Sequence, residues 1–124
     1  RRIVNPQPFF SDFLQHYKLW ERAEHLGNVI RKRMHEWKAQ HNFIGDVRGL
    51  GAMNAIELVK DRRQKTPDEP LTKKIIDQAR LHGLLLLKSG IYENVVRTLP
   101  PLTIEDSTLH EGLEIFDKVL RMHS

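Results

Sequence analysis

The sequence predicts an α+β fold in which a long N-terminal helix precedes a small sheet of three to four mostly antiparallel strands with helices on one face. A helical spacing of apolar residues follows residue 11, glycines divide an extended stretch at 44–59, and short apolar runs occur at 84–87 and 95–99. Helices and strands in this mixed order pack as layers around one core. The 124 residues are enough for a single domain with a modest core.

The first part of the chain is dominated by one long helix. Residues 1–10 contain two prolines and are expected to form an extended arm of uncertain origin, and residues 11–124 are expected to form the single domain. Ser11 is a good N-cap residue, and a helix of about 28 residues follows it. Such a length exceeds what the following residues need, so we expect this helix to serve a second domain or subunit as well. Its apolar stripe comprises Phe13, Tyr17, Trp20, Ala23, Leu26, Ile30, Met34 and Trp37.

The stretch from Ile44 to Val59 has strand character but is interrupted by glycines. Gly45, Gly49 and Gly51 are expected to divide it into two short strand pieces with a bend or bulge between them. A phosphate-binding loop is a weak alternative, because no third glycine and no helix follow. Close backbone packing at the bend is the better interpretation.

A second helix is predicted after the charged loop at residues 60–69. Asp68 or Glu69 caps it, and Pro70 lies in the first turn, where a missing N–H costs little. Gly83 ends the helix in a left-handed conformation. Its buried stripe is expected to be Leu71, Ile75, Ile76 and Ala79.

Two strands and a last helix complete the predicted order. Leu84–Leu87 lies between two glycines and is too short for a helix, so it is read as a buried strand. Val95–Leu99 forms the next strand, which Pro100 terminates. Thr103–Asp106 has the spacing of a capping box, and the helix that it opens runs to about Met122. This helix presents one apolar face with Leu109, Leu113, Phe116 and Leu120.

Composition excludes several classes of protein. The chain has no cysteine, which excludes disulfides and thiolate metal sites, and it has no apolar run long enough to cross a membrane. It also lacks a signal peptide and an initiator methionine, so we expect a cytoplasmic protein and a fragment of a longer chain. The net charge of +4 arises from the first 48 residues. Their positive charges are interleaved with acids, which favours a solvated face over nucleic-acid binding.

Arg97 is the residue of greatest chemical interest. It follows the β-branched pair Val95 and Val96 and shares a strand face with Val95 and Leu99. A guanidinium on an apolar face has lost water and needs an anion, and its planar fork matches a carboxylate. The anion is either a structural Asp or Glu or the carboxylate of a ligand, and the strand pattern leaves both alternatives open.

Other candidates carry weaker signals. The seven histidines lack the spacing of a metal site, and no serine lies in a nucleophile motif. Asp46 and Glu57 could act as an acid–base pair, but structural roles fit them better. Lys88 could form a Schiff base, yet it follows a leucine run and precedes a turn, so it is expected to reach solvent. We therefore expect no self-sufficient catalytic group and no metal ligands.

Several stretches of the chain also carry a family resemblance. They are Glu21–Gly27, Val47–Met53 with Ala55–Glu57, Gly83–Leu87, Gly90, Asn94–Arg97 and Pro101–Ile104. Together they resemble the C-terminal small domain of class III (fold-type I) pyridoxal-phosphate aminotransferases, and most closely the 4-aminobutyrate (GABA) branch. The resemblance extends over about residues 11–122.

The resemblance implies a function that the strand pattern alone does not predict. In the family, the position that matches Arg97 binds a substrate carboxylate, and Gly90 and Asn94 match positions that shape the loop before that strand. The family works as a homodimer in which this domain packs on an upstream cofactor domain. Its substrates are amino and keto acids, so the implied reaction transfers an amino group from 4-aminobutyrate to 2-oxoglutarate.

The same resemblance implies what this chain lacks. The Schiff-base lysine and the other pyridoxal-phosphate residues of the family lie upstream, and Lys88 does not match that lysine. We therefore expect the isolated chain to be inactive and to hold no cofactor. The alternative is a stand-alone, non-catalytic module that binds a carboxylate through Arg97 or a protein partner through its long helix.

Overall fold

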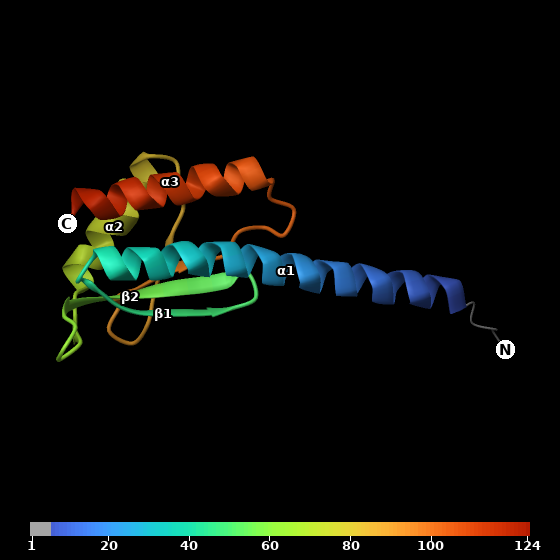
Figure 1. Ribbon diagram of the computed structural model, residues 1–124, viewed down its shortest axis with the longest axis horizontal. Helices are drawn as coiled ribbons and strands as arrows, with labels where there is room; N and C mark the ends of the chain where they lie inside the picture. The colour runs from blue at the N-terminus through green and yellow to red at the C-terminus, as the bar shows by residue number, and fades with distance from the viewer. Residues whose placement is uncertain (1–5) are drawn as a thin grey trace.

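The computed structural model describes the backbone of residues 6–124 and the side chains of residues 12–124. Three helices and five strands are arranged as the predicted α+β fold, with a long helix first and an antiparallel sheet after it (Figure 1). None of the described helices combines the length and apolar character that a bilayer crossing needs. The elements are α1 (Pro6–Gln40), β1 (Ile44–Leu50), β2 (Met53–Asp61), β3 (Thr66–Pro67), α2 (Glu69–Leu81), β4 (Leu87–Ser89), β5 (Val95–Thr98) and α3 (Asp106–Met122).

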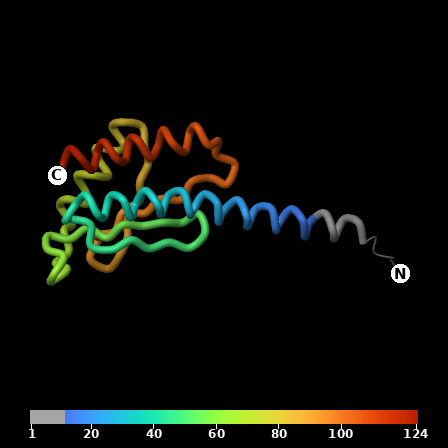
Figure 2. The backbone as a smooth tube through the Cα atoms, in the orientation of Figure 1, coloured from blue at the N-terminus to red at the C-terminus, as the bar shows by residue number. Residues whose placement is uncertain are grey.

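Helix α1 is longer than predicted because it begins at Pro6. The expected extended arm is therefore wrong for residues 6–10, and residues 1–5 lie outside the described part of the chain. Pro6 and Pro8 both fall in the first turn, where the backbone N–H groups have no intrahelical acceptor, so proline is tolerated there. Residues 12–20 of α1 extend away from the rest of the molecule (Figure 2), and all of them are exposed.

The two strand pieces predicted in the glycine-rich stretch are β1 and β2, and they pair as a hairpin in which the expected bend is a tight turn. β1 and β2 pair antiparallel from Leu50↔Met53 back to Ile44↔Leu58, and Gly51 in the turn has a φ of +58°. This positive φ favours glycine and lets the chain reverse within two residues. The predicted bulge is present, but at the start of β1, where the register shifts between Ile44 and Asp46.

Close packing at the bend, which the sequence predicted, accounts for Gly49, and the contact of α1 with the turn accounts for Gly27. A Cβ on Gly27 of α1 would lie 1.9 Å from the carbonyl oxygen of Gly51. A Cβ on Gly49 would lie 2.0 Å from Oδ1 of Asn54. The helix therefore lies directly on the hairpin turn, with no room for a methyl group.

The sheet has the order β1-β2-β5-β4, with every neighbouring pair antiparallel, and the two-residue β3 pairs with β2. The predicted strand at Leu84–Leu87 is wrong in its position, since β4 begins only at Leu87. The reason is that the N–H of Leu84 bonds to the carbonyl of Ala79 and still closes α2, after Gly83 has adopted a φ of +88°. Leu86 is buried in the core, whereas Leu85 is 76% exposed.

The two remaining helices begin differently from each other. Asp68 caps α2 as predicted, because its carboxylate accepts the N–H of Leu71, and Pro70 lies in the first turn. The predicted capping box at Thr103–Asp106 is not formed. Helix α3 begins at Asp106 after Glu105, which makes no side-chain capping bond.

All three helices lie on one side of the sheet, and the core fills the space between them. Helix α1 contacts the β1–β2 hairpin and also α3 (Figure 1). Trp37 of α1 and Phe116 of α3 pack with ring centroids 4.7 Å apart. Ile56 and Val96, paired on β2 and β5, are fully buried beneath them. The opposite face of the sheet has no helix on it among the described residues.

Candidate functional site

Arg97 lies on the helix-free face of the sheet. Its neighbour Val96 is fully buried on the helix side, and strand side chains alternate, so Arg97 points the other way. The strand register places one row across this face: Arg48 on β1, Ala55 on β2, Arg97 on β5 and Leu87 on β4. Arg97 is therefore in an interior strand, between an alanine and a leucine.

The guanidinium of Arg97 has no anionic partner within the described part of the chain. The side chain is partly buried, and its Nε is shielded from solvent without a hydrogen-bond acceptor. A shielded guanidinium N–H that lacks an acceptor is costly, because it has lost water without gaining a bond. Of the two alternatives that the sequence left open, the internal Asp or Glu is not found at this position.

The nearest acids on this face are already engaged by another arginine. Glu57 lies two residues along β2 from Ala55, and Asp46 is its partner on β1. Arg48 forms an ion pair with Glu57, and its Nε lies 3.4 Å from Oδ2 of Asp46. Asp46 and Glu57 therefore have the structural role that the sequence favoured, since they neutralise Arg48 instead of forming an acid–base pair.

The turn between β4 and β5 fixes the start of the strand that carries Arg97. Gly90 has a φ of +90°, and a Cβ there would lie 2.9 Å from Cγ2 of Val95. Asn94 is buried, and its amide donates to the carbonyl of Leu58 at 3.0 Å. In return, the N–H of Leu58 donates to the carbonyl of Asn94 at 2.7 Å. Both residues thus hold this loop in place, and their role near a ligand stays a prediction.

The other candidate side chains have structural partners. Nζ of Lys88 lies 3.6 Å from Glu69 and 3.8 Å from Glu93, so its positive charge is balanced at the surface. Burial lowers the pKa of His41 and of His123 from the ordinary value, which favours the neutral form of both imidazoles. Over the described residues, no cluster of histidine and acidic side chains could hold a metal ion.

Two arginines of α1 make contacts that sequence reasoning missed. Nη1 of Arg31 donates to Oδ1 of Asn54 at 2.8 Å and to the carbonyl of Gly51 at 3.2 Å. Arg22 reaches the segment before α3, where it contacts Leu102, Ile104 and Asp106. A signal existed for Arg31, because a fully buried asparagine in an apolar strand requires a polar partner. None existed for Arg22, because two of its three acceptors are main-chain carbonyls and all lie some 80 positions away in the chain.

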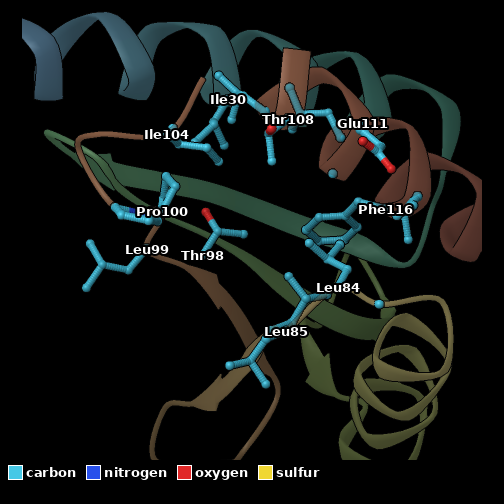
Figure 3. A pocket seen from close by; sticks show the side chains of 17 residues that line it. Ile30, Leu84, Leu85, Thr98, Leu99, Pro100, Ile104, Thr108, Glu111 and Phe116 are labelled. Carbon is cyan, nitrogen blue, oxygen red and sulfur yellow. The ribbon is translucent and has the colours of Figure 1, made fainter. Parts of the chain in front are cut away.

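An apolar groove of about 400 Å³ lies on the helix side of the sheet, between α3, the segment at Leu84–Leu86 and the end of β5. In Figure 3, Leu84 lies against Phe116, while Thr98 and Pro100 lie across from Ile104. Arg97 does not line this groove, because it belongs to the opposite face. The groove and the guanidinium are therefore separate features.

Comparison with known proteins identifies one family along almost the whole chain. The profile described as Aminotransferase class-III matches residues 11–120. A probable 4-aminobutyrate aminotransferase of Bacillus subtilis is 46% identical over 110 residues, which are 89% of this chain and 25% of that protein. The 4-aminobutyrate aminotransferase GabT of Escherichia coli is 47% identical over 100 residues, which are 81% of this chain and 24% of that protein.

Solved structures agree with this assignment. A Bacillus anthracis aminotransferase superposes with a TM-score of 0.80 at 24% identity, over 90% of this chain and 26% of that one, a likeness that concerns the fold. An Arthrobacter phospholyase in complex with phosphoethanolamine superposes with a TM-score of 0.79 at 27% identity, over 89% of this chain and 26% of that one. The chain spans about a quarter of the length of these relatives. This chain belongs to the class III aminotransferases.

Proposed function

We propose that the chain forms the C-terminal domain of a pyridoxal-phosphate-dependent aminotransferase that transfers the amino group of 4-aminobutyrate to 2-oxoglutarate. The similarity to two 4-aminobutyrate aminotransferases, at 46% and 47% identity, supports this assignment. A 5-aminovalerate aminotransferase of Pseudomonas aeruginosa is 46% identical over 98 residues, 79% of this chain and 23% of that protein. The donor is therefore an ω-amino acid, and 4-aminobutyrate is the one that we propose.

Arg97 is the residue that we propose for substrate binding, and its unpartnered guanidinium is the observation that supports the proposal. Its Nε is buried and has no acceptor, whereas Arg48 in the same row is neutralised by acids. A carboxylate of 2-oxoglutarate would supply the missing acceptors through two parallel hydrogen bonds. Ala55 and Leu87 on either side offer no competing acceptor on their side chains. A carboxylate held in this way fixes the direction of the rest of the substrate.

The described residues do not fit pyridoxal phosphate by themselves. The cofactor needs a free lysine amine for its carbonyl carbon, but Nζ of Lys88 lies between two carboxylates on the helix side of the sheet. When bound, the cofactor supplies the electron sink for amino transfer. We therefore propose that an upstream domain of the same protein holds it, and that the isolated 124-residue chain has no transaminase activity.

The exposed half of α1 supports the proposal of further contacts in the complete enzyme. Phe13, Tyr17 and Trp20 are 59%, 52% and 61% exposed, at the helical spacing that places them on one stripe. Large exposed apolar stripes on a helix mark a surface that another chain or domain covers. We propose that the upstream domain and the second subunit of a cytoplasmic homodimer share this role.

The test of Arg97 is a comparison of matched variants in the complete enzyme. Arg97→Ala should raise KM for 2-oxoglutarate roughly 10- to 100-fold, because a charge-assisted contact is worth about 1.5–3 kcal/mol. Arg97→Lys should recover only part of this loss, since an ammonium cannot form the two-bond fork. Arg48→Ala is the control on the same face and should leave KM within about twofold. An Arg97→Ala enzyme with an unchanged KM for 2-oxoglutarate would overturn the proposed role.

A second candidate is a stand-alone module that binds a carboxylate without catalysis. It is favoured by the fact that Nε of Arg97 finds no acceptor among the described residues 12–124. Calorimetric titration of the 124-residue chain with glutamate and with 2-oxoglutarate tests it. Binding that Arg97→Ala abolishes would support the module, and heats equal to those of dilution would leave the enzyme domain as the better function.

A further inference from the structure

Arg22 of α1 reaches across the molecule to the segment that follows the Arg97 strand. Its Nε donates to the carbonyl of Leu102 at 3.3 Å, and its Nη2 donates to the carbonyl of Ile104 at 2.6 Å. The same Nη2 lies 3.1 Å from Oδ1 of Asp106, the first residue of α3. One guanidinium therefore binds two main-chain carbonyls and one carboxylate, all within five residues of sequence.

The segment that Arg22 holds has few other polar contacts. It runs from Leu99 to Glu105, between β5 and α3, and contains Pro100 and Pro101, which have no N–H to donate. Its main-chain bond within the loop joins the N–H of Ile104 to the carbonyl of Pro101 at 3.0 Å. Within residues 12–124, no side chain other than Arg22 donates to a carbonyl of this segment. The segment is therefore held against the rest of the domain by Arg22 and by the packing of Leu102 and Ile104 on the core.

The held segment begins two residues after Arg97, and the strand between them is short. β5 comprises only Val95–Thr98, and its last residue, Thr98, makes a long 3.4 Å bond from its hydroxyl to the carbonyl of Asn54. Because β5 ends at Thr98, a displacement of the segment acts directly on the residue next to Arg97, while the pairing with β2 and β4 keeps the strand on its face of the sheet. Any rotation of that end changes the direction of the Arg97 side chain on the opposite face of the sheet.

We propose that Arg22 is a positioning residue for carboxylate recognition, which fixes the path of the chain after β5 and thereby the direction of the Arg97 guanidinium. The inference rests on the proposed function of Arg97 and adds a residue on the other side of the sheet. Arg22 also bears on the missing capping box at Thr103, because the carboxylate of Asp106, which a capping box would turn toward the N–H of Thr103, accepts from Nη2 of Arg22 instead.

The contact requires an arginine and not merely a positive charge. Its acceptors lie in different directions, so they need several N–H donors in a fixed arrangement. The planar guanidinium provides such a fork, whereas a lysine ammonium on a flexible stem does not. The ion pair with Asp106 is secondary, because that carboxylate is 67% exposed and water screens it. The two carbonyl contacts, which are partly buried, are therefore the ones that should position the segment.

The experiment measures KM and kcat of Arg22 variants in the complete enzyme. Arg22→Ala and Arg22→Lys should both raise KM for 2-oxoglutarate about three- to tenfold, since a small misplacement weakens a two-bond contact without removing it, and kcat should change less than about twofold. Asp106→Asn should leave KM within about twofold, because it removes only the exposed ion pair. Arg33→Ala is the matched control: it breaks another α1–α3 contact, the 2.9 Å bond from Arg33 to Glu114, away from this segment.

A double-mutant cycle separates this inference from the proposed function. If Arg22 acts through Arg97, Arg22→Lys should no longer raise KM when Arg97 is already alanine. An equal effect in both backgrounds, or an Arg22→Lys enzyme with an unchanged KM, would refute the positioning role. If Arg97→Ala alone leaves KM unchanged, it is the proposed function of Arg97 that fails, and the inference falls with it.

Amide exchange in the 124-residue chain gives an independent readout that needs no activity. Arg22→Lys should accelerate exchange at Thr98 and at Leu102–Ile104 by about tenfold or more, while the β1–β2 amides stay unchanged. Faster exchange throughout the chain would identify Arg22 as a general stabilising residue and would overturn the proposal. If the Arg22→Ala variant does not fold, the Arg22→Lys variant alone tests the proposal.

Discussion

Replacing Gly27 with alanine should destabilise the protein strongly, although the same change in most helices is stabilising. Alanine has the higher helix propensity, by about 0.8–1.0 kcal/mol, so an unhindered site should gain that amount. At Gly27, however, the new Cβ would lie 1.9 Å from the carbonyl oxygen of Gly51 and 2.9 Å from Nη1 of Arg31. The helix and the hairpin must therefore separate.

The size of this effect follows from what the separation disrupts. Overpacking of this kind costs about 1–3 kcal/mol, and occasionally more. Separation also lengthens the bonds from Arg31 to Gly51 and to the buried Asn54, and an unsatisfied buried polar group costs about 1–3 kcal/mol. After subtraction of the propensity gain from these two costs, we expect the free energy of unfolding to fall by roughly 1–5 kcal/mol.

Gly112 of α3 provides the matched control. A Cβ there would meet Cδ1 of Leu84 at 3.5 Å, which is ordinary van der Waals contact. Gly112→Ala should therefore raise the free energy of unfolding by about 0.5–1 kcal/mol. Urea denaturation followed by circular dichroism measures both variants. If Gly27→Ala proves as stabilising as Gly112→Ala, the direct contact between α1 and the hairpin turn is refuted.

Two further predictions concern buried polar groups. Asp117→Ala should destabilise by about 2 kcal/mol, because the buried indole N–H of Trp37 donates to Asp117 at 2.9 Å and would lose its acceptor; Asp117→Asn keeps an acceptor and should cost less in the same urea titration. Stability should also fall as the pH is lowered below about 6.5, because burial lowers the folded-state pKa values of His41 and His123. Between the ordinary value and the lowered one, the unfolded chain binds more protons, so this stability is present above pH 6.5 and is lost on acidification. Lys74 lowers the pKa of His123 further, whereas the Asp117 charge partly opposes the shift at His41. A midpoint urea concentration that stays flat from pH 7.5 to 5.5, or one that His41→Gln leaves equally steep, would contradict this reasoning.

Local signals in the sequence were sufficient for the cap and the stop of α2. Asp68 and Pro70 predicted the start of α2, and Gly83 predicted its end, because caps and stops depend on backbone geometry within one turn. Leu84–Leu87 was misplaced, because the first leucine still bonds back to Ala79. The sequence does not indicate how many residues lie between the end of a helix and the start of the next strand.

Signals failed where a distant residue competed for the same groups. Thr103–Asp106 has capping-box spacing, yet Arg22, some 80 positions earlier in the chain, binds the carboxylate of Asp106 that the capping box would use. The glycines at 45, 49 and 51 indicated close packing, but only the position of Gly27 on α1 shows what packs there. Spacing within one segment cannot reveal a partner that another element brings, so such contacts require the tertiary fold.

The two arginines of the helix-free face show how far sequence reasoning extends toward the site. Arg48 and Arg97 lie in one row across the sheet, separated by Ala55, and either could bind an anion by its residue type alone. The register assigns Asp46 and Glu57 to Arg48, on the edge strand, and leaves Arg97 with an alanine and a leucine. The alternation that buries Val96 in the core also forces Arg97 onto this face, because a shift by one residue would exchange the two. Nε of Arg97 is buried at a strongly fixed position and has no acceptor in the part of the chain that the structure describes, so an anion from outside the chain would satisfy it, and substrate binding should be tested first at Arg97.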